Sequence, residues 1–156
     1  MKIIAALPAY NEEVAVGSVV LRAGEQVEKV IVVDDGSTDR TKEVAELAGA
    51  VVVRHGSNAG YGAAIKTCFQ KATELDADIL VILDADGQHD PDEIPHVLQP
   101  IYEGADIVIG SRFITNENNI PAYRKFGMKV LNSATNAGSK IKVSDSQSGF
   151  RAYSKN

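Results

Sequence analysis

The chain has 156 residues, of which 44% are hydrophobic and 24% charged, so it suits one globular domain and is too apolar to be disordered. Its net charge of −5 argues against a nucleic-acid partner, and its single cysteine, Cys68, excludes an internal disulfide and fits an intracellular protein. No apolar run approaches the roughly 20 residues that a membrane-spanning helix needs, so we expect a soluble chain.

Five short apolar runs predict strands that are covered on both faces, because their apolar residues are continuous rather than alternating. These runs are Ile3–Leu7, Val30–Val33, Ala50–Val53, Ile79–Leu83 and Ile107–Ile109. Helical patterns lie between them, at residues 13–22, 41–47, 65–72 and 94–101. Strands that alternate with helices predict an α/β fold with a mostly parallel sheet flanked by helices.

The last of these helices has the clearest start signal. Asp90 is placed as its N-cap, Pro91 as its first residue and Glu93 at the third position, which is a capping-box arrangement. Cys68 lies in the apolar stripe of the preceding helix, where core packing is favoured over chemistry.

Polar clusters follow four of the predicted strands, at residues 8–12, 34–39, 84–88 and 110–112. Ligands of parallel sheets lie beyond the carboxyl ends of the strands. We therefore expect these four loops to face one crevice.

Asp84 and Asp86 leave an apolar strand and enter a turn at Gly87. Hard oxygen ligands suit Mg²⁺ or Mn²⁺, which also take phosphate oxygens and water, and Gln88 or His89 could add a ligand. The alternative is a turn with a helix cap. Because two crowded carboxylates are costly without a cation, metal binding is favoured.

The loop after the second strand holds the adjacent acids Asp34 and Asp35. Asp35 is favoured as an acceptor for the N–H groups of a nucleobase, whereas Asp39 is favoured as the cap of the next helix. In the first loop, Tyr10 could stack on a base and Glu12 could bind a ribose, although residues of these types also occur at helix starts.

Residues 58–64 open a helix with two glycines. This segment either cradles a phosphate or uses its glycines for close packing beside the ligand. The sequence leaves these two interpretations open.

Charge divides the chain into two parts. Residues 1–110 hold 8 Lys and Arg against 19 Asp and Glu, whereas residues 111–156 hold 8 against 2. In segment 123–134 the apolar residues lie near helical spacing and form a stripe, and Arg124, Lys125 and Lys129 lie off it. This pattern is compatible with a basic helix that rests on an anionic membrane surface. An ordinary packed helix with a solvated face is the alternative.

Six motifs, taken together and in order, resemble glycosyltransferase family 2. They are Pro8-Ala9-Tyr10-Asn11-Glu12, Val32-Val33-Asp34-Asp35-Gly36-Ser37, Asn58-Ala59-Gly60, Asp84-Ala85-Asp86-Gly87-Gln88-His89, Gly110-Ser111-Arg112 and Ser148-Gly149-Phe150-Arg151. The resemblance is closest to the dolichyl- and polyprenyl-phosphate sugar transferases. It implies the GT-A fold of nucleotide-diphospho-sugar transferases, which is Rossmann-like.

The resemblance also implies roles for individual residues. The nucleotide-sugar site would consist of Pro8, Tyr10, Glu12, Val33, Asp35, Asp84, Ala85 and Asp86. Asp84 and Asp86 would be the D-x-D pair that holds Mg²⁺ or Mn²⁺, with Gln88 completing the metal shell. Asp86, Asp145 and Arg112 would serve catalysis, with Asp90 an alternative to Asp145 as base and Arg112 near a phosphate of the donor or acceptor.

The implied activity is an inverting, metal-dependent transfer of a sugar from a UDP- or GDP-linked donor to a polyprenyl or dolichyl phosphate. We expect residues 1–156 to form a single catalytic domain, truncated at its C-terminus, in the cytoplasm or peripheral on the cytoplasmic membrane face. The base, the sugar and the oligomeric state stay open. The alternative is a truncated, non-catalytic module that binds a nucleotide sugar. A haloacid-dehalogenase-type phosphatase also uses a D-x-D-G motif, but that family has it in the first strand, whereas the pair here begins at Asp84. This alternative is therefore disfavoured.

Overall fold

The computed structural model describes residues 1–110 and 149–155. These residues form a six-stranded sheet of order β3-β2-β1-β4-β6-β5. The strands are β1 (Ile3–Ala9), β2 (Lys29–Asp34), β3 (Val51–Arg54), β4 (Ile79–Ile82), β5 (Ile107–Ile109) and β6 (Arg151–Ser154).

The sheet is mixed, and its central part is parallel. β1 lies between β2 and β4 and is parallel to both, and β3 is parallel to β2. β6 pairs antiparallel with both β4 and β5, so β5 runs in the same direction as β4. The predicted mostly parallel α/β sheet is confirmed. β6 was not predicted, because four residues of mixed polarity give no strand signal until two partner strands flank them.

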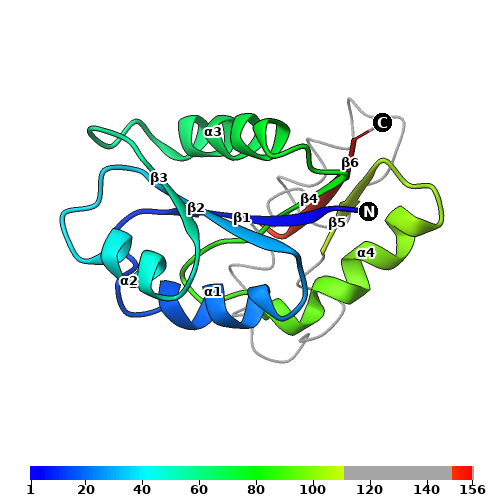
Figure 1. The fold of residues 1–156 in the computed structure, drawn as a ribbon, viewed down its shortest axis with the longest axis horizontal. Coiled ribbons are helices and arrows are strands. Elements are labelled where there is room, and N and C mark those ends of the chain that lie inside the picture. The colour runs from blue at the N-terminus through cyan, green and yellow to red at the C-terminus, as the bar shows by residue number, and fades with distance from the viewer. Residues whose placement is uncertain (111–148, 156) are drawn as a thin grey trace, which may run out of the picture.

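The helices are α1 (Val16–Gly24), α2 (Thr41–Leu47), α3 (Tyr61–Glu74) and α4 (Ile94–Tyr102), the last preceded by a short 3₁₀ turn, η1 (Pro91–Glu93). Figure 1 shows α3 on one face of the sheet and α1, α2 and α4 on the other. Each face therefore has its own apolar cluster.

The central strand explains why the predicted strands are continuously apolar. Ala5 and Leu7 of β1 belong to the cluster under α1 and α4, whereas Ile4 and Ala6 belong to the cluster under α3. Because successive side chains point to opposite faces, a strand with helices on both faces needs an apolar residue at every position. Cys68 is fully buried in the α3 cluster, and burial raises the pKa of its thiol to about 12, so the prediction of core packing is confirmed.

Two details at helix starts differ from the predictions. α1 begins at Val16 rather than Glu13, since residues 13–15 form a turn, and the backbone N–H groups of Glu12 and Glu13 donate to Thr41 Oγ1 and Asp39 Oδ2. Asp90, predicted as the N-cap of α4, caps the preceding turn η1 instead, by accepting from the Asp92 N–H. Glu93 does not complete a capping box, since its carboxylate lies 2.9 Å from His96 Nδ1.

Hydrogen bonds join the loop after β1 to the loop after β2. The Asn11 N–H donates to Ser37 Oγ (2.9 Å), and the Thr38 N–H donates to Asn11 Oδ1 (2.8 Å). The Arg40 N–H donates to Glu13 Oε2 (2.9 Å). The two loops therefore form one unit at the carboxyl edge of the sheet.

Within the described ranges, no helix combines the length and the hydropathy that crossing a bilayer requires.

Gly36 lies at the centre of this unit and provides a stability test. Its φ is +73°, and a Cβ there would lie 2.5 Å from the Ser57 carbonyl carbon. Gly49 has a φ of +96° with no atom within 4 Å of its Cβ position. We expect Gly49→Ala to lower the free energy of unfolding by about 1 kcal/mol through backbone strain alone. We expect Gly36→Ala to cost about 1–3 kcal/mol more, because backbone must move. Urea unfolding of both variants measures the difference, and equal losses would contradict the close approach.

Candidate functional site

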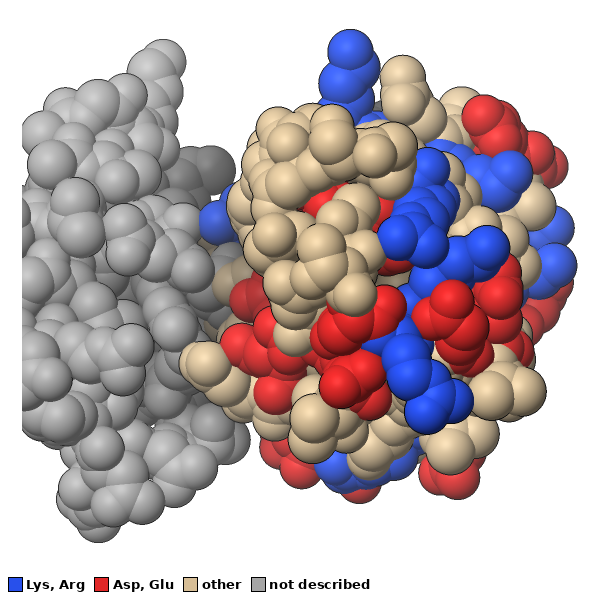
Figure 2. Space-filling view, turned by 90° about the vertical axis from the view of Figure 1, so that its left-hand side faces the viewer, with Lys and Arg blue, Asp and Glu red and all other residues tan. Residues whose placement is uncertain are grey.

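A pocket of ≈ 390 Å³ opens at the carboxyl ends of β1, β2 and β4, beside the first turn of α3. Its lining is Pro8, Ala9, Tyr10, Glu12, Asp35, Asn58, Gly60, Tyr61, Ala64, Asp84, Ala85 and Asp86. Figure 2 faces this edge of the sheet and shows acidic side chains gathered on it. Seven of the eight residues predicted for the nucleotide-sugar site line this one pocket. The exception is Val33.

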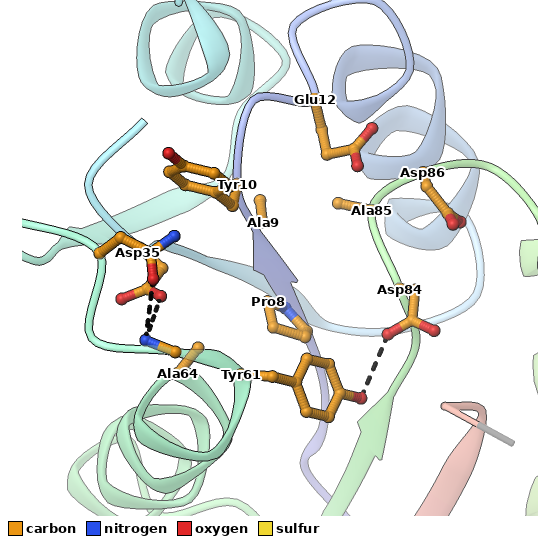
Figure 3. Close-up of a pocket in the computed structure, with 12 residues that line it drawn as sticks. Pro8, Ala9, Tyr10, Glu12, Asp35, Tyr61, Ala64, Asp84, Ala85 and Asp86 are labelled. Atoms are coloured by element: carbon orange, nitrogen blue, oxygen red, sulfur yellow. Dashed lines mark hydrogen bonds between the residues drawn. The ribbon is translucent and has the colours of Figure 1, made fainter. Parts of the chain in front are cut away.

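Figure 3 shows how the lining residues are arranged. Tyr10 and Asp35 lie at one end, Asp84 and Asp86 at the other, and Glu12 projects between them. The pocket is therefore elongated, with an aromatic ring at one end and two carboxylates at the other.

Two predicted residues lie elsewhere, and two are outside the described residues. Val33 is fully buried in the cluster under α3 and does not line the pocket. Gln88 is exposed, and its backbone N–H donates to Asp86 Oδ1 (2.9 Å). Arg112 and Asp145 fall between the two described ranges, as does the basic segment 123–134.

The start of α3 contributes more than the sequence predicted. Asn58, Gly60, Tyr61 and Ala64 all line the pocket. The N–H groups of Ala59 and Gly60 donate to the Asp35 carboxylate, so these two amides are not available to a phosphate. The structure thus favours packing beside the ligand over a phosphate cradle for this segment. Tyr61 could have been found from sequence only by placing the first turn of α3.

Asp35 is the most constrained carboxylate of the site. Its Oδ1 accepts from the Ala59 N–H (3.0 Å) and lies 2.6 Å from His55 Nδ1, and its Oδ2 accepts from the Gly60 N–H (2.8 Å). Burial by itself raises the pKa of Asp35, but the hydrogen bonds from Ala59, His55 and Gly60 outweigh it and lower the pKa below its ordinary value of 3.8. The side chain is therefore a fixed, ionised acceptor at physiological pH.

The other acids of this loop serve the fold. Asp34 is fully buried, accepts from the Ser37 N–H (2.9 Å) and pairs with Arg54 Nε (3.2 Å). Asp39 accepts from the N–H of Thr41 (2.9 Å), the first residue of α2, although the N-cap position of that helix is Arg40 rather than Asp39. Of the adjacent acids, only Asp35 lines the pocket.

Acidic side chains crowd the opposite end of the pocket. The Glu12 pKa is raised by burial and by the nearby charges of Asp86, Asp39 and Asp84. The Tyr61 hydroxyl donates to Asp84 Oδ1 (3.2 Å), and burial, together with the Asp84 charge, raises the pKa of Tyr61 to about 12. This end of the pocket favours a positively charged ligand.

Asp84 also lies close to His89 and to the backbone of Gly149. His89 Nε2 lies 3.5 Å from Asp84 Oδ2, and the buried His89 ring contacts Phe150 with 5.6 Å between the ring centroids. The Gly149 backbone is so close that a Cβ there would lie 2.1 Å from Asp84 Oδ2. This contact assigns a role to the Ser148-Gly149-Phe150-Arg151 motif, since its glycine admits the Asp84 carboxylate.

The donor set fits a divalent cation that completes its shell from a ligand. In residues 1–110 and 149–155, no three His, Cys, Asp or Glu side chains cluster closely enough to hold a metal by themselves. Mg²⁺ and Mn²⁺ sites often use one or two carboxylates, with phosphate and water oxygens filling the rest. Asp84 and Asp86 in one pocket, with their neighbour Glu12 bearing a raised pKa, match that type of site.

Comparison with known proteins shows the family of the chain. Residues 5–156 match the family model described as glycosyl transferase family 2. The chain is 39% identical to a UDP-N-acetylglucosamine–dolichyl-phosphate N-acetylglucosaminyltransferase of Methanococcus voltae, over 96% of the chain and 68% of that protein. It is 35% identical to a dolichol-phosphate mannosyltransferase of Pyrococcus furiosus, over 99% of the chain and 47% of that protein.

A solved structure shows the same fold. Glucosyl-3-phosphoglycerate synthase from Mycobacterium tuberculosis, in complex with Mn²⁺, UDP-glucose and glycerol 3-phosphate, superposes with a TM-score of 0.73 at 26% identity. The match covers 98% of this chain and 56% of that one. The fold is therefore GT-A, as predicted, and the chain spans roughly half to two thirds of the length of these proteins.

The hydrogen bonds to Asp35 predict a pH-dependent stability. A carboxyl group whose pKa is lowered in the folded state stabilises the fold above its unfolded pKa, and this contribution is lost as the pH falls through the folded pKa. We expect Asp35→Asn to lower the free energy of unfolding by about 2 kcal/mol at pH 7. The difference in the free energy of unfolding between the variant and the wild type should become smaller only below pH 3.8, the ordinary pKa of the carboxyl group. Urea unfolding from pH 7 to pH 3 measures the gap, and a gap that stays constant throughout would contradict this linkage.

The acidic end of the pocket predicts the opposite sign for Glu12. Because its pKa is raised in the folded state, the ionised side chain opposes folding at neutral pH and the protonated one does not. We expect Glu12→Gln to raise the free energy of unfolding by about 0.5 kcal/mol at pH 7 in the presence of chelator, with the gain vanishing at pH 4. Glu25→Gln, an exposed carboxylate after α1, is the matched control and should change little. A loss of stability in Glu12→Gln would show that its charge supports the fold.

Proposed function

The chain belongs to glycosyl transferase family 2, and on that premise we propose that it transfers a sugar from a nucleotide-sugar donor to a polyprenyl phosphate, with inversion and with help from a divalent cation. One observation carries the proposal. Loops from three strands bring an aromatic ring, a fixed carboxylate and a pair of aspartates into one elongated pocket.

The named relatives support this substrate class. The Methanococcus voltae and Pyrococcus furiosus proteins are named for transfer to dolichyl or dolichol phosphate, and the Mycobacterium tuberculosis structure holds Mn²⁺ and UDP-glucose. An undecaprenyl-phosphate 4-deoxy-4-formamido-L-arabinose transferase of Pseudomonas aeruginosa, 33% identical, points to the same kind of acceptor.

The nucleoside would occupy the end of the pocket at Tyr10 and Asp35. Tyr10 is 45% exposed, so its ring is open to stacking on a base beside Pro8. Asp35 presents a fixed carboxylate that can accept a base N–H, and Glu12 can accept from ribose hydroxyls. Val33, buried beneath the pocket, would act only through the packing of β2.

The donor's phosphates would lie at the acidic end. Asp84 and Asp86 would hold Mg²⁺ or Mn²⁺ there, with Gln88 as a further candidate ligand. When bound, the cation would offset the negative charge of the two phosphates and of the departing nucleotide. Tyr61 and Gly149 orient the Asp84 carboxylate, because the first donates to it and the second leaves room for it.

The reaction we propose is a direct displacement at the anomeric carbon. An acceptor phosphate oxygen forms the new C–O bond while the bond to the donor's β-phosphate breaks, and the nucleoside diphosphate leaves with the electron pair. A phosphate acceptor is already anionic, so no strong base is required. Asp86 would act through the cation, Arg112 would pair with a phosphate, and Asp145 would orient the sugar or the acceptor. Asp90 is a weaker candidate for the base, since it caps η1 and pairs with Arg22.

The acceptor implies a lipid surface. A polyprenyl phosphate keeps its chain in a bilayer, so the enzyme must work at the membrane interface, and we place it on the cytoplasmic face. The basic residues of segment 123–134 are our candidates for that contact. A module that binds the donor without transferring the sugar is the second candidate, because the described pocket holds the donor-binding residues whereas Arg112 and Asp145 lie outside the described residues.

Calorimetric titration of UDP, GDP, UDP-glucose and GDP-mannose, each with Mn²⁺ or with chelator, tests the donor site. We expect one nucleotide class to bind in a Mn²⁺-dependent manner. Asp86→Ala should weaken that binding about 10-fold or more, because a charged ligand to the cation is lost.

Asp106→Ala is the matched control, because Asp106 is an exposed aspartate that directly precedes β5, at the opposite edge of the sheet. The control should bind like the wild type. Binding of no nucleotide by the folded chain would refute the donor site. Tight donor binding without transfer to any polyprenyl phosphate would favour the non-catalytic module.

A further inference from the structure

Asp35 has few acceptor positions left for a ligand. A carboxylate oxygen accepts about two hydrogen bonds. On Oδ1 both positions are used, by the Ala59 N–H (3.0 Å) and by His55 Nδ1 (2.6 Å). On Oδ2 the Gly60 N–H (2.8 Å) uses one, so a single position remains. The side chain is only 5% exposed, so no large ligand surface can reach it.

His55 is held for this contact at both ring nitrogens. Nδ1 must carry a proton toward Asp35, because a carboxylate only accepts. Nε2 lies 2.9 Å from Thr67 Oγ1 on α3, and the Thr67 hydroxyl also lies 3.1 Å from the Ala63 carbonyl. The Thr67 hydroxyl therefore holds the ring at its second nitrogen, while Asp35 holds the first.

Asn58 adds a donor beside this single acceptor. Its Oδ1 accepts from the Gly60 N–H (3.1 Å), and this assigns the amide so that the Nδ2 group is left to donate. Asn58 and Asp35 both line the pocket. The pair therefore offers one acceptor and one donor to a planar ring that stacks near Tyr10.

From this arrangement, and resting on the proposed function, we infer that His55 is a specificity-determining residue that selects a uracil nucleotide over a guanine nucleotide. Uracil presents one ring N–H between two carbonyls, which matches a single acceptor beside a donor. Guanine presents a ring N–H next to an exocyclic amine. That amine would meet Asp35 Oδ1, whose positions are taken by His55 and Ala59. An unpaired donor in a site of this kind reduces affinity.

The test is the ratio of the dissociation constants for GDP and UDP, measured by calorimetry on the 156-residue chain with Mn²⁺. We expect the wild type to bind UDP about 10-fold or more tightly than GDP. His55→Ala frees one position on Asp35 Oδ1, so the ratio should fall to about 3 or less. A purely structural loss would weaken both nucleotides together and leave the ratio unchanged.

Two further variants make the result specific. His55→Asn keeps an N–H donor near the place of Nδ1 and should restore most of the ratio. His96→Ala removes an exposed histidine paired with Glu93, outside the pocket lining, and should match the wild type. Circular dichroism and thermal unfolding confirm that each variant is folded.

The outcomes separate this inference from the proposed function. A wild-type chain that prefers GDP, or a ratio that survives in His55→Ala, overturns the role of His55 and leaves a nucleotide site in place. A folded wild type that binds no nucleotide overturns both.

Discussion

The site depends on the position of β1 in the middle of the sheet. Because β1 pairs in parallel with β2 on one side and with β4 on the other, the loops that follow all three strands must leave at the same edge. The apolar residues of β1 fix this arrangement, since each of its faces is covered by helices. Pro8, Asp35 and Asp84 are far apart in the sequence, but their three loops therefore share one pocket.

The acids in and around that pocket divide into two kinds by what surrounds them. Asp34 and Asp39 both accept hydrogen bonds from backbone N–H groups, and Asp34 also pairs with Arg54, so these two acids stabilise the loops. Asp84 and Glu12 lie among other carboxylates, and the raised pKa of Glu12 shows the cost of that crowding. Asp35 is held by backbone N–H groups like the first kind but lines the pocket like the second, so the bonds that fix it to the start of α3 also limit what it can bind. A tightly held carboxylate is therefore more selective than a free one.

The family and the fold were within reach of the sequence because their signals are local. Apolar runs predict strands wherever a sheet is covered on both faces, and five strands and four helices were located from them. Seven of the twelve residues that line the pocket were predicted as site residues, through motifs that end those strands. The segment at the start of α3 was read only as two alternatives, because glycines serve phosphate binding and close packing equally well.

The sequence by itself determined the order of the strands β1 to β5 and of the helices, the D-x-D turn and the acidic character of the pocket, since all of these follow from side chains that are neighbours along the chain. Only the tertiary structure decided which acid faces the ligand, because Asp34 and Asp35 are chemically identical until Arg54 and the start of α3 take up their positions. It also decided that β6 is a strand, that Gly149 makes room for Asp84, and that His55 reaches Asp35. These contacts join residues 20 to 75 positions apart, and no local pattern encodes which of them will meet.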